Sequence, residues 1–142
     1  MAQTGQLGSF FIQNGDLTAR NAGGTDIPAN LFVLVDTANP PTGDNVVAVK
    51  LPTAAGGVTG TWGITRTIIK AGGNGSVCIL GGEVVKADGA ITVGDYVQAS
   101  DTALKLGYAK TKGAGIESGG RAMNSAADGE DVLIFVNPSP VA

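Results

Sequence analysis

Residues 62–80 read WGITRTIIKAGGNGSVCIL, and this stretch contains the pattern that decides the fold: an apolar segment, a glycine-rich turn and a second apolar segment. In the first segment Trp62, Ile64 and Ile68 alternate with other residues, which is the two-residue period of a β-strand with one buried face. The turn at 72–75 is made of residues that accept a positive φ. The stretch therefore predicts two antiparallel strands, at 62–69 and 76–80, joined by a hairpin turn.

The same alternation of short apolar segments and turn signals continues on both sides of this stretch. The 23 glycines and 6 prolines leave few uninterrupted stretches as long as the ~11–12 residues of an average helix. We predict an all-β fold, a compact antiparallel β-barrel or β-sandwich. A turn at Gly81-Gly82 separates 76–80 from the next predicted strand, and the remaining predicted strands are 31–36, 46–51, 83–86, 96–100, 104–110, 113–117, 121–123 and 131–136.

Two of these strands, 31–35 and 132–136, are apolar at every position, so both of their faces are expected to be dry. One face of each packs into the core. The other face is covered either by a partner molecule or by loops and strands of the same chain, and the sequence leaves both alternatives open. If a partner covers it, Ile134 is a candidate contact residue.

Arg66 and Cys78 are two residues with reactive groups in the apolar stretch. Arg66 falls on the apolar face of its strand, and we interpret it as a structural cation paired with carboxylates rather than as a functional one. Cys78 is the single cysteine of the chain and lies among Val77, Ile79 and Leu80. A cysteine in such a setting is typically buried and inert.

A faint internal repeat links two distant segments. Residues 27–33, IPANLFV, resemble residues 91–97, ITVGDYV, and each segment is followed by an Asp-Thr-Ala sequence, with one residue inserted in the second copy. Asn30 corresponds to Gly94, and these two residue types most readily adopt a left-handed conformation. The similarity indicates either a repeated turn leading into an aromatic-bearing strand or a coincidence in a chain of biased composition.

Residues 1–30 differ in character from the remainder and are predicted to form an extended N-terminal arm, followed by a single β domain at 31–142. Phe10, Phe11 and Ile12 form the only sizeable apolar cluster of this region, which is too small to be a core of its own. The arm is expected to lie on a partner. The alternative is that it adds an edge strand to its own barrel.

Composition excludes several classes of function. Without histidine, the chain cannot form a Ser-His-Asp or Cys-His arrangement or a His-ligated zinc site. A net charge of −3 has the wrong sign for nucleic-acid binding. Apolar stretches are far shorter than the ~18 residues of a membrane span, and residues 1–5 lack the pattern of a signal peptide. We therefore expect synthesis inside a cell, in the cytoplasm, and neither a nucleic-acid nor a membrane partner.

Candidate chemical sites are weak. The glycine-rich segments at 72–76 and 113–118 lack the lysine of a phosphate loop and the third glycine of a dinucleotide fingerprint, respectively. Asp128, Glu130 and Asp131 do not have the spacing of a calcium loop and are interpreted as a solvated acidic turn. We expect no catalytic residue, metal, cofactor or small-molecule substrate.

The second half of the chain is similar to a known family. Residues 82–97 read GEVVKADGAITVGDYV, residues 113–118 read GAGIES, and residues 121–136 read RAMNSAADGEDVLIFV. The Gly-Asp-Tyr-Val turn at 94–97 and the closing Ala-Ala-Asp-Gly-Glu-Asp-Val segment at 126–132 resemble those of the capsid decoration, or cement, proteins of tailed bacteriophages. The resemblance implies a β-barrel or β-tulip-like domain, usually trimeric, that sits on the capsid exterior across neighbouring major-capsid subunits and resists internal pressure.

On this basis the expected function is that of a non-enzymatic virion protein, a homotrimer that binds the major capsid protein and stabilises the expanded head. The alternatives are a sugar- or ligand-binding β-barrel module of a fibre or adhesin-like assembly, and a hydrolase that uses only carboxylates. The residues expected to contact the capsid or a neighbouring subunit are Phe10, Phe11, Ile12, Trp62 and Ile134.

Overall fold

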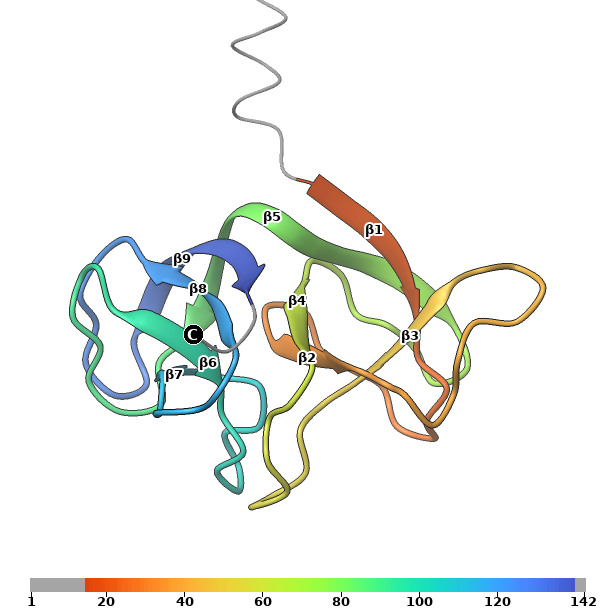
Figure 1. Ribbon diagram of the computed structural model, residues 1–142, viewed down its shortest axis with the longest axis horizontal. Helices are drawn as coiled ribbons and strands as arrows, with labels where there is room; N and C mark the ends of the chain where they lie inside the picture. The colour runs from red at the N-terminus through yellow and green to blue at the C-terminus, as the bar shows by residue number, and fades with distance from the viewer. Residues whose placement is uncertain (1–14, 140–142) are drawn as a thin grey trace, which may run out of the picture.

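The computed structural model describes residues 15–139, and within this range it contains nine β-strands and no helix (Figure 1). The all-β prediction is therefore confirmed. Accordingly, no described segment is a helix capable of crossing a membrane. The strands are β1 (Gly15–Arg20), β2 (Phe32–Val35), β3 (Val47–Lys50), β4 (Thr61–Thr65), β5 (Asn74–Lys86), β6 (Tyr96–Ala99), β7 (Ala109–Thr111), β8 (Ser118–Ala122) and β9 (Asp131–Ser139).

The first five strands form a closed barrel. They pair in the order β1-β3-β2-β4-β5, and a further pairing between β5 and β1 closes the ring. All of these pairs are antiparallel except β1 with β3, which is parallel. Closure leaves the ring without an unpaired first or last strand.

The second half of β5 begins another ring, in the order β5-β9-β8-β6-β7. A parallel bridge between Ala87, directly after β5, and Ala109 of β7 brings this ring back to its start. The Asp88 amide donates a hydrogen bond of 2.7 Å to the Ala109 carbonyl at the same place. The molecule thus consists of two small barrels that share one long strand, and Figure 1 shows β5 passing from one to the other.

The predicted turn at Gly81-Gly82 is wrong, because the chain continues through it as one strand. β1 pairs with β5 as far as Leu80, and β9 pairs with β5 from Gly81 onward. Gly81 has a φ of 120°, which side chains of L-residues disfavour. A glycine at this position therefore lets one strand change partners between the barrels.

The two barrels have the same topology. In the second barrel, the second half of β5 takes the place of β1, and β6, β7 and β8 take the places of β2, β3 and β4. β9 takes the place of the first half of β5. With this matching, the parallel pair and the four antiparallel pairs all recur. The sequence repeat marks equivalent positions, since Ile27 bridges Ile69 in one barrel and Ile91 bridges Ala126 in the other. Asn30 and Gly94 both have a positive φ, 62° and 90°.

The second copy of the sequence repeat has one more residue than the first before its Asp-Thr-Ala sequence, and the structure explains this insertion. The Asp36 carboxylate accepts a hydrogen bond from the amide of Ala38, and the Ser100 hydroxyl accepts one from the amide of Thr102. Ser100, rather than Asp101, therefore occupies the place of Asp36 in the second barrel.

The core has two parts. The interior of the first barrel contains a cluster of six buried residues, Ala19, Ile27, Val33, Val49, Ile69 and Val77. Phe32 and Leu34 point to the other side of β2 and join Ile64, Cys78 and the interior residues of the second barrel in a larger cluster. Both faces of the strand predicted at 31–35 are thus covered by other parts of the same chain rather than by a partner molecule.

Other strand predictions are corrected at their boundaries. β1 lies within the range assigned to the arm, and it pairs inside the first barrel; the part of that range that the structure describes therefore belongs to the barrel. Residues 104–108 and 113–117 are turns and loops rather than strands.

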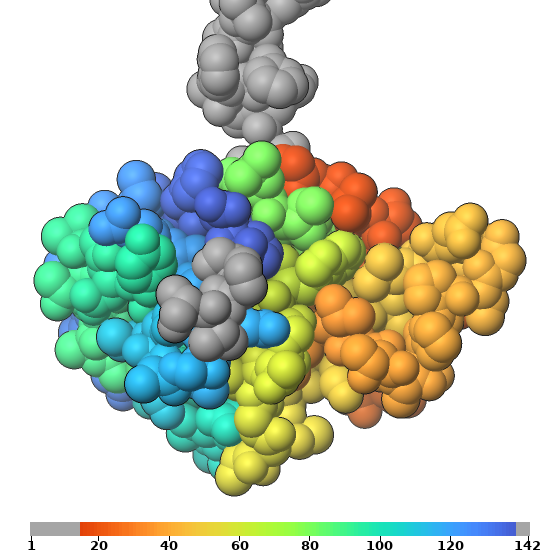
Figure 2. Space-filling model, viewed as in Figure 1, coloured from red at the N-terminus to blue at the C-terminus, as the bar shows by residue number. Residues whose placement is uncertain are grey.

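In the space-filling view (Figure 2), the connection between β2 and β3 projects from the end of the first barrel.

Candidate interaction surface

β9 presents one buried and one exposed face. Val132, Ile134 and Val136 are fully buried, whereas Leu133 and Phe135 are each 43 % exposed. The expected contact residue Ile134 is therefore corrected: its side chain fills the core and has no exposed surface. The apolar residues that β9 offers to a partner are its two neighbours in sequence.

A row of side chains runs from Phe135 across three strands. Phe135 lies opposite Gly82 of β5 on one side and opposite Arg121 of β8 on the other, and Arg121 in turn lies opposite Tyr96 of β6. The Arg121 guanidinium carbon is 4.9 Å from the centre of the Tyr96 ring, a cation–π contact. The Arg121 Nε donates to the Gly94 carbonyl at 3.2 Å, which holds the side chain in this position.

A second, parallel row adds aliphatic surface. Leu133 lies opposite Val84 of β5, and its carbonyl accepts a hydrogen bond of 2.8 Å from the amide of Met123. We call the combined surface the outer apolar face; it consists of Val84, Tyr96, Arg121, Met123, Leu133 and Phe135.

Two hollows on the outer apolar face meet at Arg121 and Phe135. One, of about 390 Å³, extends toward Val93 and Met123. The other, of about 480 Å³, extends toward Tyr96 and Asn137. Exposed aromatic, methionine and arginine side chains around hollows are the composition of protein–protein interfaces. The surface is thus suited to bind a protein.

The other expected contact residues have different outcomes. Trp62 is half-buried in β4 and packs against the interior cluster of the first barrel. Phe10, Phe11 and Ile12 lie outside the described residues. The sequence analysis missed Tyr96, Arg121 and Phe135 as a group because they come together only through strand pairing. The one local feature that could have indicated this surface was an arginine in the short strand predicted at 121–123.

Arg66 is a structural cation, as predicted. Its Nε lies 2.7 Å from the Asp16 carboxylate, and its Nη1 lies 2.8 Å from the Glu83 carboxylate. Partial burial works against the charged guanidinium, but the hydrogen bond to Asp16 and the charge of Glu83 prevail and raise the pKa of Arg66. Cys78 is buried nearby, and burial raises the pKa of its thiol although Arg66 acts in the opposite direction. A thiol in this state is a poor nucleophile.

The acidic residues of the second barrel fix loops. The Asp88 carboxylate accepts hydrogen bonds from the hydroxyls of Ser100 and Thr102, at 2.5 and 2.7 Å. Lys105 Nζ lies 3.3 Å from Asp88 and 2.6 Å from Asp128. Burial alone would raise the pKa of Asp88, but the hydroxyl hydrogen bonds and Lys105 lower it. Across residues 15–139, acidic and cysteine side chains form no group that could hold a metal ion.

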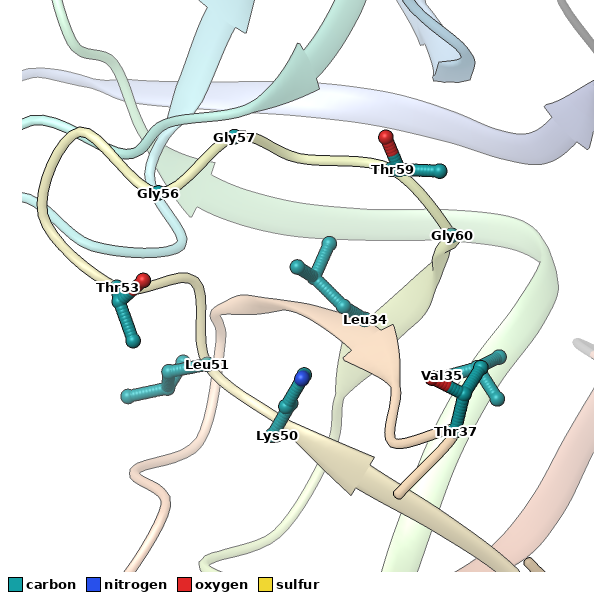
Figure 3. Close-up of a pocket in the computed structure, with 10 residues that line it drawn as sticks. All are labelled: Leu34, Val35, Thr37, Lys50, Leu51, Thr53, Gly56, Gly57, Thr59 and Gly60. Carbon is teal, nitrogen blue, oxygen red and sulfur yellow. The ribbon is translucent and has the colours of Figure 1, made fainter.

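A further hollow, of about 250 Å³, lies on the first barrel between β2, β3 and the loop that follows β3. Figure 3 shows Leu34 pointing toward the glycines of that loop, with Lys50 on the neighbouring strand. Lys50 is the single ionisable residue among those that line it.

Comparison with known proteins adds one finding on the fold. No family model matches the chain, and no curated protein matches it. The structure is similar to the crystal structure of the head fiber gp8.5 N base in bacteriophage phi29, with a TM-score of 0.58 and 18 % sequence identity. The match covers 92 % of this chain and 99 % of that one, so the chain shares its fold with the base of a phage head fibre.

Proposed function

We propose that the chain is a structural protein of a bacteriophage head, located in the virion on the capsid exterior. There it binds the major capsid protein as a homotrimer and stabilises the expanded shell, without catalysing a reaction. This assignment combines the family resemblance of the sequence with the fold.

The observation that carries the proposal is the extent of the structural match. The similarity to the phi29 head-fibre base extends over 92 % of this chain, so it includes both barrels rather than one common small barrel. A shared fold does not by itself establish a shared role. Here it agrees with the resemblance of residues 82–137 to capsid decoration proteins, which was found from sequence alone.

The outer apolar face supplies a physical basis for assembly. Burying Leu133, Phe135 and Met123 against another protein removes apolar surface from water, which favours association. Because a head carries many equivalent sites, modest contacts repeated over many copies add up to a large stabilisation of the shell. Neither an acid, a base nor a metal is needed for this role.

The experiment that tests the proposal is heat rupture of heads. Expanded heads that lack this protein are heated with and without the purified chain, and release of DNA is followed with an intercalating dye. The proposal predicts rupture at a higher temperature when the chain is present. An unchanged rupture temperature at saturating protein would contradict it.

A further inference from the structure

The connection between β6 and β7 exposes a leucine in a backbone conformation that leucine disfavours. Leu104 has a φ of 68°, and its side chain is 97 % exposed. A bulky residue in the left-handed region is an outlier in proteins. A fully exposed side chain contributes almost no packing energy to offset this disfavoured conformation. Leucine at this position therefore does not stabilise the fold.

Other turns of the same protein use glycine where this one uses leucine. Seven turns of the described chain close with a hydrogen bond from the fourth residue to the first and have a positive φ at the third residue, the position that favours glycine in a type II turn. The third residue is Gly72, Gly94, Gly107, Gly115 or Gly129 in five of them, Ala55 in the sixth and Leu104 in the seventh. Gly107 is in the turn that directly follows that of Leu104.

The turn that presents Leu104 is held firmly on both sides. The Thr102 hydroxyl donates to Asp88 at 2.7 Å, and the Lys105 ammonium lies between Asp88 and Asp128. The Lys105 amide donates to the Thr102 carbonyl at 3.0 Å. These contacts fix the backbone around Leu104, so little backbone conformational entropy is lost when the turn binds a partner.

The β6–β7 connection, which carries Leu104, lies away from β9. In Figure 1 the β6–β7 connection is at the bottom of the view, beside the β3–β4 connection, whereas β9 is near the top. The two connections are joined by the Ala55 amide, which donates to the Asp101 carbonyl at 2.9 Å. Leu104 also lines a hollow of about 500 Å³ with Leu31, Leu106 and Tyr108, so this end of the molecule has apolar surface of its own.

We propose that Leu104 is an anchor residue that inserts into an apolar pocket of the head protein to which the chain binds. This inference rests on the proposed function and names the contact. Binding hot spots lie in well-packed pockets of a partner from which water is excluded, and an apolar side chain on a fixed turn suits such a pocket. A lipid surface is a poorer match, because membrane-binding segments combine several apolar residues with basic ones, whereas the neighbour Asp101 is acidic and Lys105 is already paired with two carboxylates.

The test compares variants at two positions with the same backbone conformation. Asparagine accepts a left-handed conformation better than leucine, so Leu104→Asn is expected to melt at or above the temperature of the unmodified chain. Its affinity for heads lacking the protein, measured by co-sedimentation titration, is expected to fall about tenfold or more. Leu104→Met keeps an apolar side chain and should bind within about twofold of the unmodified chain. The matched control Ala55→Asn should leave binding unchanged.

The outcomes separate this inference from the proposed function. If the unmodified chain does not bind heads at all, the proposed function fails and this inference fails with it. If the unmodified chain binds and Leu104→Asn binds equally well, only the anchor is refuted. A markedly lower melting temperature for Leu104→Asn would also overturn the inference, because leucine would then serve the fold. Sedimentation of the unmodified chain, but not of Leu104→Asn, with neutral lipid vesicles would overturn the assignment to a protein partner.

Discussion

The Arg66 guanidinium lies 2.8 Å from the Glu83 carboxylate, and this ion pair joins the first barrel to the half of β5 that belongs to the second. Arg66 follows β4, and Glu83 is two residues beyond the point at which β5 changes partners. The other side of the guanidinium holds Asp16 of β1. One side chain thus ties together three segments at the junction of the barrels.

Replacing Arg66 should destabilise the whole molecule. Arg66→Met leaves two carboxylates without their cation and is expected to lower the free energy of unfolding by about 2 kcal/mol, measured by urea denaturation. Lys70→Met is the control, because the Lys70–Asp26 pair is largely exposed and exposed pairs contribute about 1 kcal/mol or less. Equal losses in the two variants would show that the junction ion pairs have no special role.

Gly63 of β4 is expected to tolerate no side chain. A Cβ at this position would lie 2.3 Å from the carbonyl oxygen of Cys78 and 2.8 Å from a methyl carbon of Val77. Gly63→Ala should therefore cost about 1–3 kcal/mol through overpacking. Gly24→Ala, where nothing lies within 4 Å of the added carbon, should be close to neutral. Thermal melting of both variants checks the close approach of β4 to β5.

Acid should weaken the second barrel through Asp88. Hydrogen bonds from Ser100 and Thr102 and the charge of Lys105 outweigh the effect of burial and lower the pKa of Asp88 in the folded state. A lowered folded-state pKa contributes stability that is present above the unfolded value of about 4 and is lost as the pH falls through the folded value. The stability difference between the unmodified chain and Asp88→Asn should thus be large at pH 7 and shrink below about pH 4. Urea denaturation at pH 7 and pH 3 measures it, and a constant difference would contradict the assigned role.

Adjacent residues of β9 should separate stability from assembly. Ile134→Asp buries an unpaired carboxylate and is expected to cost about 3–5 kcal/mol. Phe135→Asp places the charge on the outer apolar face, so the chain should remain folded but lose self-association, measured by sedimentation equilibrium. Leu17→Asp, at an exposed apolar position of the first barrel, should keep the assembled mass. A monomeric unmodified chain, or an assembled Phe135→Asp variant, would show that this face does not join copies.

The sequence was informative where burial and local pattern coincide. The strands at 31–36, 46–51, 96–100 and 131–136 correspond to β2, β3, β6 and β9, because each combines apolar residues with clear turn signals at its ends. β1 was missed because GDLTAR has little apolar pattern; Ala19 is its one buried residue. Its strand conformation comes from pairing with distant segments on both sides.

The functional surface could be predicted only in part, for two physical reasons. An all-apolar strand does not reveal which face is covered by its own chain, so the sequence could not distinguish Ile134 from Phe135. Strand pairing then brings Arg121 between Tyr96 and Phe135, and such distant contacts leave no local pattern. Leu104 was placed at the start of the strand predicted at 104–110, and nothing in the local sequence marks its positive φ.

The most direct measurement is sedimentation of the purified chain with heads that lack it, with the bound amount quantified against the major capsid protein. If the chain is a structural component of the head exterior, it should pellet with the heads, saturate at a fixed ratio to the capsid subunit and remain in solution without them. A chain that stays in the supernatant at every concentration of expanded heads would contradict the central claim.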